Sequence, residues 1–434
     1  MNDLSLERLV NSTLLVPFPG AAPPRWVLEG LERGVSGVTL FAINGNVPGA
    51  GELASLTGRL RRSADVNTAD DNPIIGTRAF GSDPELVARH ITAAVSGLQE
   101  AGVAACAKHF PGHGATSQDS HLEIPLVDAD LELLERRELV PFRAAIAASV
   151  RSIMTAHLRV PVVTGATPAT LSPAAITGLL RGTLGYDGVV VTDALDMRAA
   201  GDAIGIPEAA VRALAAGADL LCLGSKEYED SVRAIRERIM EAVREGRLSD
   251  ERLEEAAARV TALKAWLAVP RTAEVDRATG LEAARRAVHV TGSPSVGTRP
   301  VIVELRTTSN IAVGPVPWGL SPWAPDAVAV DAETADPGDV LARATGRPLV
   351  VVVRDAHRYP RHRALVSALL AARPDTVLVE MGLPVWRPEG TVRAAAYVAT
   401  YGATRANARA AAEIIGLIHE ETEAGGTITS SEAG

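Results

Sequence analysis

Short apolar runs alternate with longer stretches of helical periodicity over the first 270 residues of this chain. The short runs have the length of buried strands, whereas the longer stretches repeat apolar side chains at helical spacing. Strand-length runs occupy residues 13–17, 38–42, 104–108, 152–156, 189–192 and 219–223. Helical stretches occupy residues 84–100, 131–148, 206–216, 227–245 and 250–267. This alternation predicts βα units built on a parallel sheet.

The pattern changes after Pro270 and starts afresh near residue 291. Further strand-length runs occupy residues 301–305, 349–354, 376–380 and 395–399, with helical stretches at 361–372 and 404–420. Because 434 residues exceed what one hydrophobic core usually organises, two domains are expected. We therefore predict a larger α/β domain over residues 1–270, a linker over 271–290, a smaller α/β sandwich domain over 291–420 and a disordered tail over 421–434.

Composition narrows the class of partner. The net charge of -9 argues against a nucleic-acid partner, which requires concentrated Lys and Arg. No apolar run is long enough to cross a membrane, and the acidic N-terminus lacks a secretory signal. The two cysteines, Cys106 and Cys222, lie inside apolar runs, as buried thiols in a reducing compartment would. A cytoplasmic protein with a small or neutral substrate is expected.

Ionisable residues crowd the end of the 104–108 run, where a parallel strand would deliver them to the mouth of an α/β fold. Lys108 and His109 would offer a polar ligand one cation and one imidazole, although His109 could instead be a hydrogen-bonded rim residue. Asp119 and His121 follow in a loop with little apolar anchoring. Their spacing suits a carboxylate–imidazole dyad for proton transfer, and it equally suits a solvated surface pair.

A second group of polar residues follows the 189–192 run. Asp193 comes directly after this buried strand, where a carboxylate is costly unless hydrogen bonds or a ligand compensate. It is therefore a better candidate nucleophile than Asp196, which we expect to brace the following turn. His157, at the end of another run, shows no partner in the sequence and is expected to be structural.

Three segments together resemble the β-N-acetylhexosaminidases of glycoside hydrolase family 3. They are residues 105–114 (ACAKHFPGHG) with 119–121 (DSH), residues 184–197 (LGYDGVVVTDALDM) and residues 72–84 (NPIIGTRAFGSDP). The resemblance implies a (β/α)₈-type TIM barrel for the first domain. It also implies retaining hydrolysis of a terminal β-linked N-acetylglucosamine from saccharides such as cell-wall muropeptide fragments.

The same resemblance implies roles for individual residues. Asp193 would be the nucleophile that forms a covalent glycosyl-enzyme. His121, paired with Asp119, would be the acid and base. Three further residues, Arg78, Lys108 and His109, match the family positions that grip sugar hydroxyls. No metal and no organic cofactor is implied.

One segment departs from the family pattern. Residues 59–63 (RLRRS) run directly into 64–68 (ADVNT), where relatives carry two βα units and a sugar-binding carboxylate. We therefore expect a barrel that lacks about two βα units, with about six recognisable strands. Two alternatives to the hydrolase follow: a phosphorylase, because a neutral imidazole does not repel phosphate, and a catalytically impaired member that only binds sugar. Nothing in the pattern specifies an oligomeric state.

Overall fold

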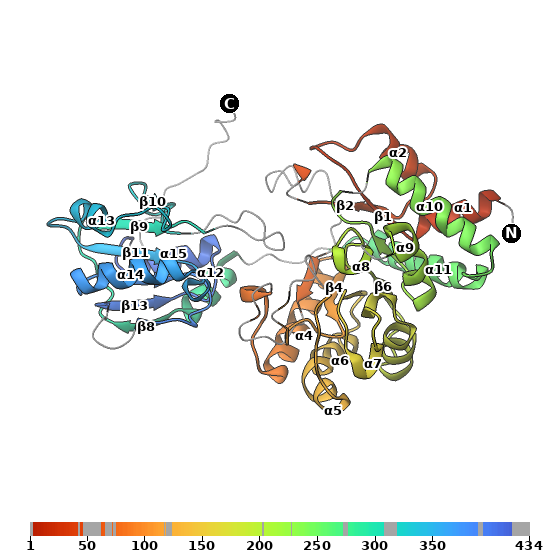
Figure 1. Ribbon diagram of the computed structural model, residues 1–434, viewed down its shortest axis with the longest axis horizontal. Helices are drawn as coiled ribbons and strands as arrows, with labels where there is room; N and C mark the ends of the chain where they lie inside the picture. Colours follow the sequence, from red (N-terminus) through yellow and green to blue (C-terminus); the bar gives the residue numbers. More distant parts are fainter. Residues whose placement is uncertain are drawn as a thin grey trace. The chain divides into compact units, whose positions relative to one another are not determined.

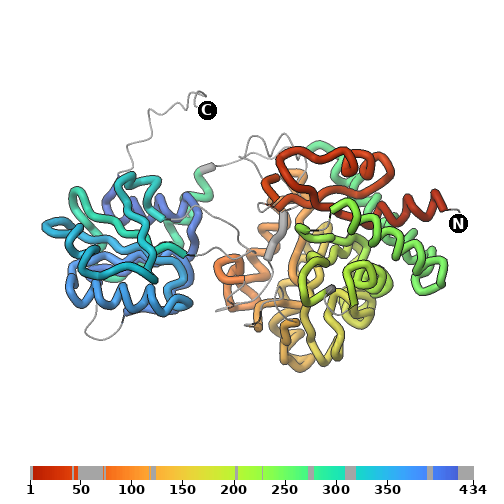
Figure 2. Tube along the Cα trace, turned by 45° about the horizontal axis from the view of Figure 1, so that its top comes forward, coloured from red at the N-terminus to blue at the C-terminus, as the bar shows by residue number. Residues whose placement is uncertain are grey.

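The computed structural model describes residues 3–41, 44–46, 62–65, 72, 75–116, 118, 124–201, 204–226, 228–271, 277–307, 319–388 and 394–418. The chain divides into two compact units, Met1–Glu274 and Val275–Gly434 (Figures 1 and 2). Each unit has its own set of mainly parallel strands and its own buried apolar side chains. The two are therefore described separately.

Seven strands form the sheet framework of the first unit in the part of the chain that the structure describes. They are β1 (Leu14–Pro17), β2 (Gly37–Thr39), β3 (Arg62–Asp65), β4 (Ala105–Phe110), β5 (Ser152–Thr155), β6 (Val189–Val191) and β7 (Leu221–Cys222). All pairings are parallel, in the orders β2-β1-β7 and β3-β4-β5-β6. A parallel bridge between Val191 and Leu220 joins β6 to the start of β7. The strand order is therefore β2-β1-β7-β6-β5-β4-β3.

Helices follow most of these strands, as the alternating pattern predicts. They are α1 (Asp3–Ser12), α2 (Arg25–Glu32), α4 (Pro84–Glu100), α5 (Leu131–Leu133), α6 (Leu139–Ala147), α7 (Pro161–Thr164), α8 (Arg198–Gly201), α9 (Ile206–Ala216), α10 (Glu229–Arg244) and α11 (Asp250–Ala268). π-Helical segments occupy Leu134–Glu138 and Ala174–Thr183. The helices α4 and α9 have the bounds expected from the sequence, because each carries clear end signals. Asp83 caps α4, and Gly217 ends α9 at a φ of 113°.

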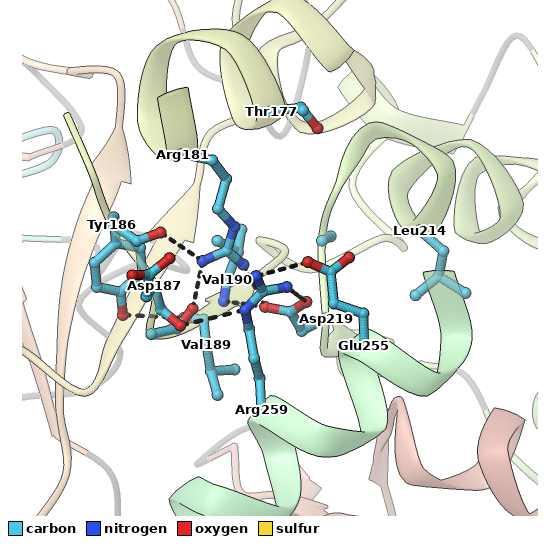
Figure 3. A network of polar contacts seen from close by, with 12 residues as sticks. Thr177, Arg181, Tyr186, Asp187, Val189, Val190, Leu214, Asp219, Glu255 and Arg259 are labelled. Atoms are coloured by element: carbon cyan, nitrogen blue, oxygen red, sulfur yellow. Dashed lines mark hydrogen bonds and ion pairs between the residues drawn. The ribbon is translucent and has the colours of Figure 1, made fainter. Parts of the chain in front are cut away.

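The two faces of this sheet are buried in different ways, since side chains alternate along a strand. Ala105, Ala107 and Phe110 of β4 belong to the larger apolar cluster, with residues from α4 and α6. Cys106 and its counterparts on β6 and β7 belong to a second cluster that includes Val260 and Leu263 of α11. The helix α11 therefore covers the face of the sheet opposite to α4 and α6. Figure 3 shows its Arg259 beside Asp219, which precedes β7.

The second unit contains a six-stranded sheet in the order β10-β9-β11-β12-β13-β8. Its strands are β8 (His289–Gly292), β9 (Val301–Leu305), β10 (Val328–Val330), β11 (Leu349–Val353), β12 (Val377–Glu380) and β13 (Ala396–Ala399). All pair in parallel except β8, which runs antiparallel to β13. The helices are α12 (Arg277–Ala287), α13 (Pro337–Arg343), α14 (Pro360–Ala372) and α15 (Arg405–Ile414). Apolar clusters lie on both faces of the sheet, as buried parallel strands require.

Three features differ from the sequence expectations. Residues 271–290 do not form a plain linker, because α12 occupies Arg277–Ala287 and its Arg285 pairs with Glu413 of α15 at 2.7 Å. The strand β3 adds a seventh strand where six were expected, since its polar sequence carries no apolar alternation. The strands β8 and β10 were likewise not predicted. The expected tail at 421–434 lies outside the described residues.

Within the described ranges, no helix combines the length and the apolar character needed to cross a membrane.

Candidate active site

The carboxyl end of β4 carries Lys108 and His109. The pairing of β4 with β5 shifts register between Lys108 and Phe110, and the Lys108–His109 and Phe110–Pro111 peptide bonds are cis. The side chain of Phe110 is fully buried edge-on against Phe142 of α6, with ring centroids 5.2 Å apart. This packing fixes the strand end from which His109 projects.

Asp193 lies two residues beyond the end of β6, beside His109. Its Oδ1 accepts a hydrogen bond from the backbone N–H of Ala194 at 2.8 Å. Its Oδ2 lies 3.9 Å from His109 Nε2, which is longer than a hydrogen bond. The side chain keeps 18% of its surface exposed, so one carboxylate oxygen faces His109 while the group remains accessible to a ligand.

The electrostatics of His109 show which cations surround it. Burial lowers its pKa well below 6.5, and the positive charges of Lys108 and Arg78 lower it further. The imidazole is therefore neutral at neutral pH, and its contact with Asp193 is not a charged ion pair. Arg78 comes from the 3₁₀ turn Gly76–Arg78. The structure thus brings Arg78, Lys108, His109 and Asp193 into one neighbourhood.

Asp119 and His121, the other two expected site residues, lie outside the described residues. Their proposed roles as an acid/base pair stay predictions.

The turn after Asp193 is held from two sides. His157 is fully buried, and its Nε2 lies 2.9 Å from the carbonyl oxygen of Ala194. Asp196 accepts hydrogen bonds from the backbone N–H groups of Ser225 at 2.8 Å and Lys226 at 3.2 Å. The bracing role expected of Asp196 is confirmed, and the structure supplies the partner for His157 that the sequence did not reveal.

A buried thiol lies under the same site. Cys222 of β7 is 6% exposed, and its pKa is raised to about 12, first by burial and then by the charges of Asp193 and Asp196. The thiol stays protonated at neutral pH and acts as a small apolar side chain. Cys106 is buried as well, and neither cysteine is in a disulfide, so the expectation of two buried thiols is confirmed.

Asn72 is a site residue that the sequence reasoning did not single out. Its Nδ2 donates to the carbonyl oxygens of three loop residues, His113 at 2.7 Å, Gly114 at 3.2 Å and Thr116 at 2.7 Å. Its Oδ1 accepts from the backbone N–H of Ile75 at 2.8 Å. The side chain is 3% exposed. The signal available in the sequence is the asparagine that opens the 72–84 segment, but its hydrogen-bond partners lie more than 40 residues away.

Among the residues that the structure describes, no three His, Cys, Asp or Glu side chains converge in a way that could hold a metal ion.

Comparison with known proteins identifies the first unit. The family model "Glycosyl hydrolase family 3 N terminal domain" matches residues 61–263. "Beta-hexosaminidase LpqI" of Mycobacterium tuberculosis is 41% identical over 207 residues, 46% of this chain and 52% of that protein. "Beta-hexosaminidase A" of Pseudoalteromonas piscicida is 36% identical over 221 residues, 47% of this chain and 37% of that protein. The chain thus spans about half, or less, of the length of these curated relatives.

A solved structure matches almost the whole chain. It is a glycoside hydrolase family 3 β-N-acetylglucosaminidase from Paenibacillus sp. str. FPU-7, with a TM-score of 0.82 and 29% sequence identity. The match covers 95% of this chain and 97% of that one. The family model, the curated relatives and the structural neighbour agree: residues 61–263 match the N-terminal domain of glycosyl hydrolase family 3, and the chain as a whole is similar in fold to a β-N-acetylglucosaminidase of that family.

Proposed function

We propose that this chain is a retaining β-N-acetylhexosaminidase that removes a terminal β-linked N-acetylglucosamine. The observation that carries the proposal is Asp193, a partly exposed carboxylate at the carboxyl end of β6, beside a neutral His109 and near Arg78 and Lys108. A carboxylate held at a strand end among hydrogen-bond donors is suited to attack a sugar carbon. The names of the relatives, β-hexosaminidase and β-N-acetylglucosaminidase, support this substrate class.

The reaction proceeds in two steps. In the first, Asp193 attacks the anomeric carbon while the bond to the leaving oxygen breaks and that oxygen takes a proton from His121. The product is a glycosyl ester of Asp193. In the second, His121 takes a proton from water, the water oxygen attacks the anomeric carbon, and Asp193 leaves as a carboxylate. Asp119 holds the tautomer of His121 and stabilises its protonated form.

Three described residues bind the sugar. Arg78 and Lys108 donate charge-assisted hydrogen bonds to hydroxyl or carbonyl oxygens, whereas neutral His109 can donate or accept one. Its lowered pKa keeps it from carrying a proton that would pair permanently with Asp193. Cell-wall muropeptide fragments are the saccharides we propose as substrates. The mechanism requires no metal and no cofactor.

We further propose that the fold of the first unit is a TIM barrel with strand material missing between β2 and β3. In support, β2 and β3 stand at the two ends of the strand order among the described residues. Only residues 40–61 separate them in the chain, fewer than the ~30 that a βα unit takes. The same gap motivates the second candidate, a member of the family that binds sugar but turns it over poorly.

The test is release of chromophore from an aryl β-N-acetylglucosaminide by the whole chain. We expect turnover in the wild type and a loss of about 10³-fold or more in Asp193→Ala, because the covalent route is removed. Asp187→Ala is the matched control, since this exposed aspartate lies at the opposite end of β6. Its turnover should equal the wild type. Cooperative thermal unfolding of each variant shows that the fold persists.

The outcomes separate the candidates. Turnover that survives in Asp193→Ala removes Asp193 from the nucleophile role. Folded wild-type protein without turnover, which is still stabilised by N-acetylglucosamine, favours the impaired sugar-binding member. A parallel assay with inorganic phosphate tests the phosphorylase alternative: formation of N-acetylglucosamine 1-phosphate in place of the free sugar would make phosphate the acceptor.

A further inference from the structure

The loop that connects β4 to the segment around Leu126 starts with a tightly held stretch. Asn72 donates to the carbonyl oxygens of His113, Gly114 and Thr116, so one buried side chain holds the backbone over residues 113–116. The Asn72 amide is itself oriented, because its Oδ1 accepts from the N–H of Ile75. The two hydrogens of the Asn72 amide donate to three carbonyl oxygens. A flipped amide would lose these hydrogen bonds and would place its oxygen against the carbonyl groups.

The far end of the same loop is also held. The side-chain Oε1 of Gln118 accepts a hydrogen bond from the backbone N–H of Leu126 at 2.8 Å. The backbone N–H of Gln118 donates to Thr116 Oγ1 at 3.2 Å. Leu126 in turn forms a parallel bridge with Arg159, beyond β5. The described residues on both sides of 119–123 are therefore tied to each other, and Leu126 is tied to the segment that follows β5.

The ring of His113 is part of this arrangement. His113 is 2% exposed, and its ring meets that of His109 edge-on, with centroids 5.8 Å apart. Gly112, just before it, has a φ of 134°, and a Cβ there would fall 2.4 Å from Cγ of the buried Glu138. No larger residue fits at this position without displacing the loop or the π-helical segment Leu134–Glu138 that carries Glu138. The path of the backbone from His109 to Thr116 is thus determined by packing as well as by Asn72.

We propose that Asn72 is a positioning residue for the acid/base pair of this active site. Thr116 precedes Asp119 by three residues, so the anchored carbonyls set where the chain that carries Asp119 and His121 begins. Arg78 follows Asn72 by six residues in the same segment. The hydrogen bonds of Asn72 therefore connect the segment that carries the sugar-binding arginine to the loop that leads to the acid/base pair. The inference rests on the proposed function, because it assigns Asn72 an effect on proton transfer to the leaving group.

The dependence on leaving group distinguishes this role from a structural one. A phenyl glycoside needs a proton on its leaving oxygen, whereas a dinitrophenyl glycoside departs without one. The ratio kcat/KM reports the step that forms the glycosyl-enzyme, the only step at which the leaving group differs. A misplaced acid therefore lowers kcat/KM for the first substrate and spares the second, while general damage to the fold lowers both.

We expect Asn72→Ala to lower kcat/KM for phenyl β-N-acetylglucosaminide by about 10²-fold and for the dinitrophenyl analogue by less than about threefold. His121→Ala, measured beside it, sets the full size of the leaving-group effect. Asn11→Ala is the matched control. Asn11 is also a buried asparagine whose Nδ2 donates to a backbone carbonyl, that of Arg33 at 3.0 Å, and it should lower both values equally or leave both unchanged.

Gln118 provides a second pair of variants should Asn72→Ala fail to fold. Gln118→Ala removes the acceptor for the N–H of Leu126 and should show the same leaving-group pattern in weaker form. Gln118→Glu keeps an acceptor oxygen and should restore the wild-type values. Equal losses for both substrates in Asn72→Ala and Gln118→Ala, with a clear leaving-group effect in His121→Ala, overturn this inference alone. A wild-type enzyme without turnover of either substrate overturns it together with the proposed function.

Discussion

Asp219 is a buried carboxylate of the first unit that pairs with three arginines. Its carboxylate is fully buried, and Oδ2 accepts from Arg181 Nη2 at 2.6 Å and from the N–H of Val190 at 2.9 Å (Figure 3). Its Oδ1 lies 2.5 Å from Arg252 Nη2 and 3.4 Å from Arg259 Nη1. One carboxylate thus compensates charge from three guanidinium groups and also ties α11 to the start of β7.

Asp219→Asn should lower the free energy of unfolding of the first unit by about 3 to 5 kcal/mol. The amide keeps the shape but removes the negative charge, so three partly buried guanidinium groups lose their shared partner. Urea unfolding monitored by circular dichroism measures the change. Asp230→Asn is the control, because its pair with Arg233 is exposed, and it should cost less than about 1 kcal/mol. Losses of equal size in the two variants would contradict this account.

At the scale of elements, α11 has a packing role that the strand pattern did not reveal. Its Val260 and Leu263 belong to the same apolar cluster as Val191 of β6 and Cys222 of β7. Arg259 of the same helix contacts the carbonyl oxygen of Asp187 and the carboxylate of Asp219, which precede β6 and β7, whereas Asp193 lies beyond the carboxyl end of β6. The helix α11 therefore packs near the amino ends of β6 and β7, and the site lies beyond the carboxyl ends of the strands.

Leu263→Ala should therefore lower the free energy of unfolding of the first unit and leave kcat/KM nearly unchanged. Leu263 is 4% exposed, and truncation of such a leucine lowers the free energy of unfolding by ~2 to 5 kcal/mol. The value of kcat/KM at a temperature well below unfolding should stay within about threefold of the wild type, since Asp193 lies at the other end of β6. Leu28→Ala, on an exposed position of α2, is the control and should change stability little. A loss of activity in folded Leu263→Ala would show that α11 also positions the site.

The sequence predicted elements whose signals are local and missed those whose signals are not. The helix α4 was predicted to the residue, because Asp83 and Pro84 mark its start and an apolar stripe follows. The strand β3 was missed, because Arg62–Asp65 is polar and gains its strand form by pairing with β4. The sequence predicts a linker where α12 forms for a similar reason: the partner of this helix, α15, lies over 100 residues further along the chain.

The site shows the same difference between residues with local sequence signals and residues whose partners lie far along the chain. Lys108, His109 and Asp193 follow apolar strands directly, and the rule that parallel strands gather their carboxyl ends predicts that they meet. Their neighbourhood in the structure agrees with this. The role of Asn72 could not be predicted, since it depends on hydrogen bonds to residues far along the chain, and no periodicity records them.

At the scale of the whole molecule, the stabilities of the two units should depend differently on pH, because the second unit contains Glu380, a buried carboxyl group with a raised pKa. This carboxylate, at the end of β12, accepts hydrogen bonds from the N–H groups of Asp355 at 2.7 Å, Ala356 at 3.1 Å and Gly382 at 2.7 Å. It is 1% exposed, and burial raises its pKa to about 7, although the three donors act in the opposite direction. At a pH between the ordinary pKa of a glutamate and about 7, Glu380 is therefore protonated in the folded unit and ionised in the unfolded chain.

The sign of the pH dependence follows from this raised pKa. Between the ordinary value of 4.5 and about 7, the folded state binds more protons than the unfolded state, so stability falls as pH rises through this window. From pH 5 to pH 8 the contribution of Glu380 to the unfolding free energy of the second unit should decrease by about 2 to 3 kcal/mol. Glu380→Gln cannot titrate. Its amide also places a donor among three N–H groups, so the variant is less stable at every pH and the slope, not the absolute value, is the measurement.

Scanning calorimetry of the whole chain at pH 5, 6.5 and 8 tests this with two transitions, one for each unit. As pH rises, the transition temperature of the second unit should fall further in the wild type than in Glu380→Gln. The transition temperature of the first unit should change by the same amount in both proteins. Comparison with the variant cancels every other titrating group, including His109, whose lowered pKa makes the first unit lose stability as pH falls. Parallel pH profiles for the second unit in the two proteins would show that Glu380 keeps an ordinary pKa, and a single merged transition would show that the units do not unfold independently.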